Sequence, residues 1–359
     1  MPLPDVWLLV GLAVLALLLA GWLSPLETLG WWAGWFGEPS PGPERPVPPQ
    51  PGESVRNRTR RDLARHLRPD VTTRPAPRRF VVFLSGIHSV SGRAYTVRER
   101  NLLHRLRARL PDAAVIEVFP YSVTNRALTG QRFFARFWRW SLRMKLRKRV
   151  LTSIAGMLIN LRNLWQVAIS ADRRYGPLYN YGSAVLIRDA LIANGYRVGS
   201  GAPVVLIGYS GGGQIALGAA AFLDDLIGVP IHVVGLGGVM SADPGVLQVA
   251  KLVYLAGSAD RLLRLGTAFF PGRWSVSRHS HWFQAEREGR VERVDMGPMT
   301  HMGPHGYLSS STRLPDGRSY LEATVEVIAE VAENAETVAP TMAPGLNRGT
   351  SPTPPAAPG

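Results

Sequence analysis

Residues 203–225 of the chain read PVVLIGYSGGGQIALGAAAFLDD and hold the strongest local signal in the sequence. The run Val204–Ile207 is continuously apolar, which is typical of a central strand covered on both faces. The Ala- and Leu-rich run Gln214–Asp224 predicts a helix. Between them, Gly208-Tyr209-Ser210-Gly211-Gly212 forms a G-x-S-x-G pattern. This order predicts a sharp strand–turn–helix bend with the Ser210 hydroxyl exposed above the sheet, because the glycines relieve crowding where the two backbones nearly touch.

Outside this stretch, strand-like and helix-like runs alternate along the chain. Strands are expected at Phe80–Ser85, Ala114–Phe119, Val204–Tyr209, Ile231–Leu236, Leu252–Leu255 and Val291–Asp295. Helices are expected near Tyr95–Leu110, Tyr181–Asn194, Gln214–Leu226 and Tyr320–Ala335. Alternation of this kind predicts an α/β fold with a mostly parallel central sheet and helices on both of its faces.

The composition restricts the classes of protein to consider. The chain has 359 residues, a net charge of +15 and no cysteine, so no disulfide framework is possible. A basic composition of this kind is typical of chains that meet nucleic acid or an anionic membrane surface. We find no nucleic-acid-binding motif, and much of the charge gathers in one insertion, so we expect no nucleic acid partner. Nothing in the sequence indicates the oligomeric state.

A membrane anchor is predicted at the N-terminus. Val6–Leu23 carries no charge and is long enough to cross a bilayer as a helix at about 1.5 Å per residue. No basic residue precedes it and no clear cleavage site follows, which favours a retained single-pass helix over a signal peptide. Tryptophans cluster at and after its end, where such rings favour the membrane–water boundary. We therefore assign residues 1–37 to an anchor and interfacial segment.

Charge and proline content organise the remaining segments. Asp5 lies before the apolar run and Arg45 to Arg61 supply five arginines after it, so the positive-inside rule places the bulk of the protein on the cytoplasmic side of the membrane. Residues 38–79 read as a Pro/Arg-rich linker, and residues 339–359 as a disordered tail. The domain that carries the alternating pattern spans residues 80–338.

One long segment, residues 124–180, interrupts the alternation and exceeds the length of a usual connection. Two apolar stripes at helical spacing run through it: Phe134, Trp138, Leu142, Leu146 and Val150, then Leu151, Ile154, Leu158, Leu161 and Trp165. Arginines and lysines fill much of the first helix. One interpretation is that helices pack on the core with a solvated basic face. We favour a basic amphipathic cap that lies on an anionic lipid surface.

The strand, turn and helix around Ser210 resemble the nucleophile elbow of the α/β-hydrolase superfamily, and the resemblance covers roughly residues 80–335. It implies a Ser-His-Asp triad in the chain order Ser, acid, His. The implied acid is Asp260, in the turn after Leu252–Leu255, with Asp243 as the alternative. The implied histidine is His301, after the last strand, with His305 as the alternative.

The same resemblance implies the groups that stabilise the oxyanion. One backbone N–H comes from the residue after the nucleophile, Gly211, and another from the loop after the first strand, where Ile87 is the expected donor. The resemblance implies no cofactor. A metal site is the alternative for His279, His281, His301 and His305, which fall within a short span. Gly303 and Pro304 disfavour a helix between the last two histidines and no acid completes the set, so no metal is expected.

The function expected from the sequence is that of a membrane-anchored serine hydrolase that cleaves an ester or thioester, with a lipid or acylated substrate suggested by the anchor and the cap. Two alternatives stay open. An acyltransferase would use the same nucleophile and pass the acyl group to an acceptor other than water. A catalytically silent hydrolase fold would act as a membrane-tethered scaffold. Acyl length and leaving group do not follow from the fold.

Overall fold

The structure is a computed structural model that describes residues 76–88, 95–121 and 150–335, together with the single positions 8, 11 and 15. Side chains of residues 150–159 are not described. Apart from those single positions, the predicted anchor lies outside the described residues, and so do residues 38–75 of the linker, the first apolar stripe of the insertion up to Leu146, and the C-terminal tail. Among the helices of the described residues, none is both long and apolar enough to span a membrane.

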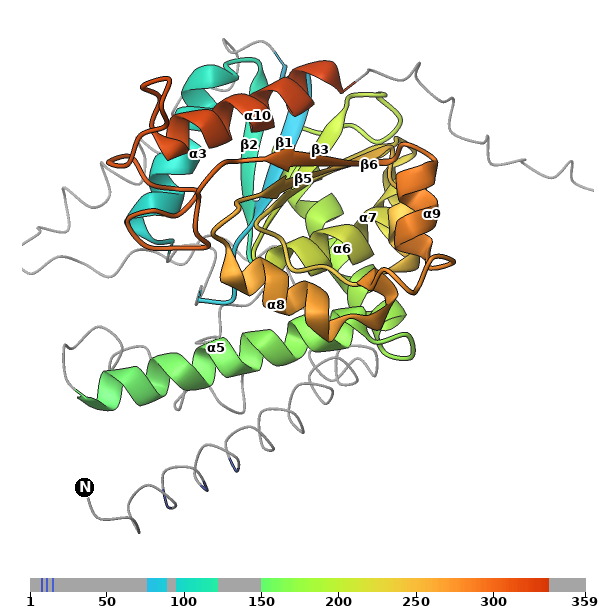
Figure 1. Ribbon diagram of the computed structural model, residues 1–359. Coiled ribbons are helices and arrows are strands. Elements are labelled where there is room, and N and C mark those ends of the chain that lie inside the picture. The colour runs from blue at the N-terminus through green and yellow to red at the C-terminus, as the bar shows by residue number, and fades with distance from the viewer. Residues whose placement is uncertain are drawn as a thin grey trace, which may run out of the picture.

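The core is a six-stranded sheet in which every strand runs parallel to its neighbours, in the order β2-β1-β3-β4-β5-β6 (Figure 1). The strands are β1 (Arg79–Leu84), β2 (Ala113–Val118), β3 (Val204–Tyr209), β4 (Ile231–Leu236), β5 (Lys251–Ala256) and β6 (Val291–Asp295). All six coincide with the expected strands to within one residue at either end. The predicted α/β fold with a parallel sheet is therefore confirmed.

Helices cover both faces of the sheet. On one face lie α3 (Val97–Arg109) and α10 (Tyr320–Asn334); on the other lie α5 (Val150–Ala171), α6 (Gly176–Ala193), α7 (Gly212–Ile227), α8 (Arg261–Phe269) and α9 (His281–Arg287) (Figure 1). Alternate residues of β1 enter the two cores: Val82 packs toward α7, and Val81 packs toward α3 and α10. Burial on both faces explains the continuous apolar runs in the sequence.

Local signals set several helix ends. Thr96 and Ser319 form capping boxes with Glu99 and Glu322 at the starts of α3 and α10. Helix α7 ends at Gly228, which adopts a left-handed conformation with φ of 70°. Helices α8 and α9 were not among the helices expected from the sequence, because each is short and follows a polar turn.

Helix α5 contains the second apolar stripe of the insertion, and its described part buries several polar side chains beside the apolar Val167 and Ile169. Asn163, Gln166 and Ser170 are buried, whereas Leu161 and Trp165 of the expected stripe are only half-buried. This part of α5 packs on α6 and α7. The buried polar side chains bind backbone groups of the sheet's loops, as described below, and that is why apolar periodicity did not reveal them.

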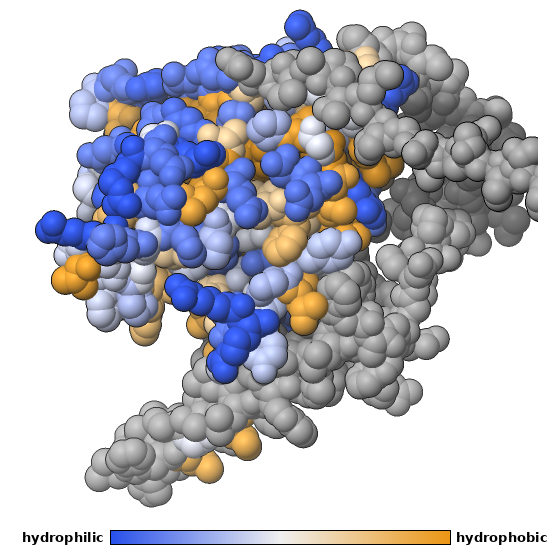
Figure 2. Space-filling view, turned by 90° about the vertical axis from the view of Figure 1, so that its right-hand side faces the viewer, coloured by the Kyte–Doolittle hydropathy of each residue, from blue (hydrophilic) through white to orange (hydrophobic). Residues whose placement is uncertain are grey.

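The order of the strands also indicates where a ligand would bind. The chain moves outward from β1 to β2 and then returns to place β3 on the other side of β1. In open parallel sheets, ligands bind beyond the carboxyl ends of the strands where the order reverses, which here is between β1 and β3. On the side of the molecule that carries α9, hydrophobic residues form small groups among hydrophilic ones, as on most protein surfaces (Figure 2).

Candidate active site

Ser210 stands at the carboxyl end of β3, in the turn that leads into α7. Its φ is 55°, and it is the one non-glycine residue with a positive φ among the residues that the structure describes. A side chain in this region strains the backbone by about 1–3 kcal/mol, and such strain gathers at functional sites. Backbone hydrogen bonds hold Ser210 in this conformation. The Ser210 N–H donates to the Leu236 carbonyl at 3.1 Å, and the Ser210 carbonyl accepts from the N–H groups of Gly213 and Val239.

The glycines around Ser210 are required by close backbone contacts. A Cβ on Gly212 would lie 2.6 Å from the Leu84 carbonyl oxygen, and one on Gly213 would lie 2.9 Å from the Cα of Gly238. Both distances are shorter than real Cβ contacts, so α7 can start this close to the ends of β1 and β4 only with glycine there. The turn therefore presents the Ser210 side chain at the carboxyl edge of the sheet.

His301 and Asp260 reach this serine from two other strand ends. His301 follows β6, and its Nε2 lies 2.8 Å from the Ser210 Oγ. Its Nδ1 lies 2.9 Å from Oδ2 of Asp260, which follows β5. All three side chains are buried, so the expectation that the Ser210 hydroxyl is exposed was wrong, because the side chain of His301 packs against it. Parallel strands bring their carboxyl ends to one edge, so three residues far apart in the sequence form one continuous chain of hydrogen bonds.

Asp260 is held by groups other than the histidine. Its Oδ1 accepts the Leu263 N–H at 2.9 Å and so caps α8, and its Oδ2 accepts the Tyr307 hydroxyl at 2.9 Å. Burial, the largest single effect, raises the pKa of this carboxyl. The hydrogen bond and charge of His301, with the bonds from Leu263 and Tyr307, outweigh burial and keep the Asp260 pKa below its ordinary value. Asp260 is therefore an anion that faces His301.

Two tyrosines that the sequence analysis did not single out support the site. The Tyr307 hydroxyl accepts from the Gly257 N–H at 2.8 Å while it donates to Asp260, and burial together with the Asp260 charge raises its pKa. The Tyr209 ring stacks on the His301 imidazole with centroids 5.9 Å apart, and its hydroxyl donates to the His301 carbonyl at 3.0 Å. No local pattern marks Tyr307; Tyr209 is the variable position of G-x-S-x-G.

The alternative site residues lie elsewhere. Asp243 accepts from the Gly245 N–H and from the Gln214 side chain, and burial raises its pKa. His305 is exposed, and its Nδ1 lies 3.4 Å from the Thr312 Oγ1. Neither contacts Ser210. Among the described residues, no three His, Cys, Asp or Glu side chains come together as a metal site would require.

The two expected oxyanion donors, Gly211 and Ile87, are neighbours. A Cβ on Gly211 would lie 2.7 Å from the Ile87 Cγ2 and 2.8 Å from the Val167 Cγ2, so Gly211 is tightly enclosed beside Ser210. Within the described part of the chain, neither backbone N–H donates a hydrogen bond. The turn before Ile87 also lies close to Ser210, since a Cβ on Gly86 would lie 3.3 Å from the Ser210 Cβ.

A second histidine borders the site on the loop after β1. His88 Nε2 lies 3.3 Å from Oε2 of the fully buried Glu99, and the His88 ring meets the Tyr209 ring edge-on at 6.1 Å. Burial, the largest effect, raises the pKa of Glu99, but the hydrogen bond and charge of His88 with the bonds from Thr96 outweigh it and lower that pKa. His88 therefore ties the loop after β1 to α3.

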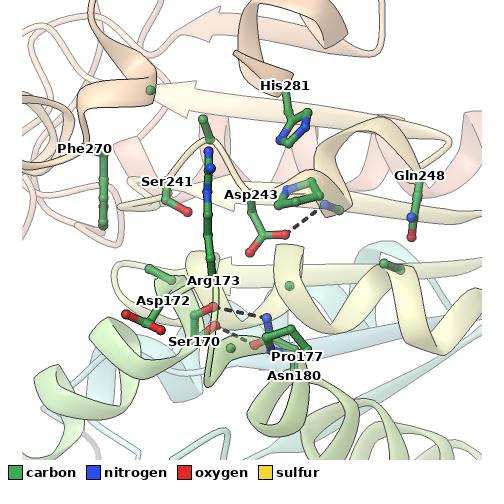
Figure 3. Close-up of a pocket in the computed structure, with 18 of the residues that line it drawn as sticks. Ser170, Asp172, Arg173, Pro177, Asn180, Ser241, Asp243, Gln248, Phe270 and His281 are labelled. Carbon is green, nitrogen blue, oxygen red and sulfur yellow. Dashed lines mark hydrogen bonds between the residues drawn. The ribbon is translucent and has the colours of Figure 1, made fainter.

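A cavity of about 680 Å³ lies beside this site and is distinct from it. Asp243, Gln248 and His281 line one side, and Ser170, Pro177 and Asn180 line the opposite side (Figure 3). None of Ser210, Asp260 and His301 is among its lining residues. Its wall is joined to α7 through Gln214, whose side chain donates to Asp243 and accepts from the Ser241 N–H.

A comparison of the sequence with models of known protein families finds no match, and a search of curated proteins likewise finds none. Any family for this chain is thus a proposal that rests on its fold and its side chains.

Proposed function

We propose that the protein is a serine hydrolase of the α/β-hydrolase type that cleaves an ester or thioester. The observation that carries the proposal is the unbroken chain from Ser210 Oγ through the His301 imidazole to Asp260, with distances of 2.8 Å and 2.9 Å. A serine hydroxyl is a weak nucleophile at neutral pH and needs a base beside it and a third group to orient that base. This arrangement supplies both.

In the proposed reaction, the Ser210 Oγ attacks the substrate carbonyl carbon while its proton moves to His301 Nε2. The resulting oxyanion accepts hydrogen bonds from the N–H groups of Gly211 and Ile87. The intermediate then collapses, the leaving alcohol or thiol takes the proton from His301, and an acyl ester forms on Ser210. Water, deprotonated by His301, attacks this ester, and collapse releases the acid and restores the Ser210 hydroxyl. Asp260 stabilises the transient imidazolium.

The substrate class that we favour is an acyl group presented at an anionic lipid surface. Helix α8 begins directly after Asp260 and buries Leu263 and Gly266, while Leu262, Leu265 and Phe269 form an exposed apolar face at i, i+3 and i+7. The following loop adds exposed Trp274 and Val276 and is joined to α8 by the bond from Trp274 Nε1 to the Ala268 carbonyl. These two parts together are the α8 surface.

The charge beside the α8 surface favours an anionic lipid partner. Arg261 and Arg264 are exposed on α8, on the flank of its apolar face, and Arg278 is exposed shortly after the loop. An apolar strip bordered by arginines suits a membrane interface, where apolar side chains enter the acyl boundary and cations meet the head groups. The predicted anchor over residues 6–23 and its cytoplasmic orientation stay part of this proposal.

The test of the proposed activity is labelling with a fluorophosphonate, which reacts only with an activated serine. We expect the wild-type protein to be labelled in proportion to time and Ser210→Ala to remain unlabelled, because the Ser210 Oγ is the only serine oxygen bonded to a histidine in the described residues. Heat-denatured protein is the control for non-specific reaction. A folded wild-type protein that is not labelled would contradict the proposal.

The lipid partner predicts local contact at the α8 surface. The chain has no cysteine, so a single introduced one carries a unique label. Val276 is 81% exposed in the α8 surface. Val198 is 56% exposed and lies between α6 and β3, at the end of the sheet where the strands begin. With anionic vesicles, we expect a bimane on Val276→Cys to shift to the blue and to be quenched by brominated lipids. The matched Val198→Cys should show neither change. Equal responses at the two positions would count against this surface.

A further inference from the structure

The loop that carries the Ile87 donor is tied by two buried side chains. The Tyr121 hydroxyl donates to the Ser85 carbonyl at 2.9 Å, and Tyr121 is fully buried. The Asn163 Nδ2 donates to the Ile87 carbonyl at 2.6 Å, and Asn163 is also fully buried. Both bonds reach carbonyl groups of the loop directly beyond β1, where the proposed oxyanion hole lies.

The two bonds hold the peptide groups on either side of the proposed donor. The Ser85 carbonyl belongs to the peptide before Gly86, and the Ile87 carbonyl belongs to the peptide that leads to His88. The peptide between them carries the Ile87 N–H. Because Gly86 is the most flexible kind of residue in a loop, its backbone would otherwise sample several conformations. Two fixed neighbours leave the Ile87 N–H in one orientation before any substrate arrives.

A buried arginine joins the backbone of Tyr121 to the side chain of Asn163. Arg162 Nη1 donates to the Tyr121 carbonyl at 2.9 Å and lies 3.3 Å from the Asn163 Oδ1. The second contact directs the amide oxygen of Asn163 toward the cation, so the amide nitrogen faces the Ile87 carbonyl. A network of this kind is stronger than its separate bonds, since it lies out of water.

These two side chains connect the loop after β1 to the insertion. Tyr121 is the last described residue before the insertion, and Asn163 lies on α5, the helix within it. We propose that Tyr121 and Asn163 are positioning residues for the Ile87 N–H, so that the seating of α5 sets the geometry of the oxyanion hole. This inference rests on the proposed hydrolase function and adds to it a link between the insertion and the reacting centre.

The kinetic signature of such residues is a loss in kcat without a matching change in KM. Removal of a whole oxyanion donor costs about 10²–10³ in kcat. Loosening a donor that is still present should lower kcat by less than removing it. We therefore expect Asn163→Ala and Tyr121→Phe each to lower kcat for a soluble ester by about tenfold or more, with KM nearly constant. Affinity for an arylboronic acid, which forms a tetrahedral adduct on serine, should fall in parallel because its oxygen occupies the same position.

The control for a merely structural effect is Tyr196→Phe. Tyr196 is buried and packs edge-on against Phe80 at the start of β1, far from the loop that follows that strand. We expect the Tyr196→Phe variant to keep the wild-type kcat and the wild-type affinity for the arylboronic acid. A wild-type protein without hydrolysis would overturn the proposed function and this inference together. An active wild type whose Asn163→Ala and Tyr121→Phe variants keep both kcat and boronate affinity would overturn the inference alone.

Discussion

Replacing either Ser210 or His301 by alanine is expected to lower kcat for ester hydrolysis by about 10⁶, and replacing both is expected to cost little more. The two groups act as a unit, because the serine attacks only if the histidine takes its proton, so losing one member forfeits most of what the other contributes. The distance of 2.8 Å between Ser210 Oγ and His301 Nε2 already places the proton within reach of its acceptor. The measurement is steady-state hydrolysis of a short-chain ester, with the active sites counted by titration.

His305 supplies the matched control for this experiment. It lies four residues from His301 in the same loop, is exposed, and contacts the Thr312 Oγ1. We expect His305→Ala to keep kcat within about twofold, as a surface substitution usually does. The opposite result, an inactive His305→Ala with an active His301→Ala, would require a different arrangement of the loop after β6 in solution.

The parts of the fold that follow from local patterns were predictable from the sequence. The six strands are short apolar runs separated by turn residues, and each lies within one residue of its expected position. The bend at Ser210 was predictable as well, since glycines mark the positions where α7 nearly touches the ends of β1 and β4. The chain order of Ser210, Asp260 and His301 required the resemblance to a known family, and the structure then brings these three side chains together.

The supporting contacts could not be predicted, because they join residues that are far apart in the sequence. Tyr307 meets Asp260 across 47 residues, and Asn163 meets the Ile87 carbonyl across 76. Apolar periodicity also did not reveal which polar side chains of α5 are buried: the protein buries Asn163 and Gln166, while Leu161 and Trp165 are half-buried. A polar residue is buried only where its partners exist, and those partners are set by the tertiary structure.

Asp260→Asn is expected to lower kcat by about 10⁴, less than the loss of Ser210 or His301. An asparagine amide in the place of Oδ2 would donate to His301 Nδ1 and so leave the histidine proton on Nε2. That tautomer cannot accept the proton of Ser210. The Tyr307 hydroxyl, which donates to the same oxygen, would face the amide group as well. The measurement is the pH profile of kcat for the wild type and the variant.

A second readout follows from the lowered pKa of Asp260. Because its pKa in the folded protein lies below the ordinary value of 3.8, the charged carboxylate contributes stability that is present above that value and is lost as the pH falls through the folded-state pKa. Asp260→Asn removes the titrating group, so the free energy of unfolding of the variant should change less with pH on the acid side than that of the wild type. Urea denaturation at several acid pH values measures the difference.

Asp243→Asn distinguishes the role of Asp260 from the loss of any buried aspartate near the site. Both carboxyls are buried or nearly so and both cap a short helix, Asp260 at α8 and Asp243 at the turn Pro244–Leu247. Only Asp260 contacts a histidine that touches Ser210. If Asp243→Asn lost as much activity as Asp260→Asn, the effect would report damage to the loops and not the orientation of His301. A large loss at Asp260 with little at Asp243 would tie the loss to the His301 imidazole.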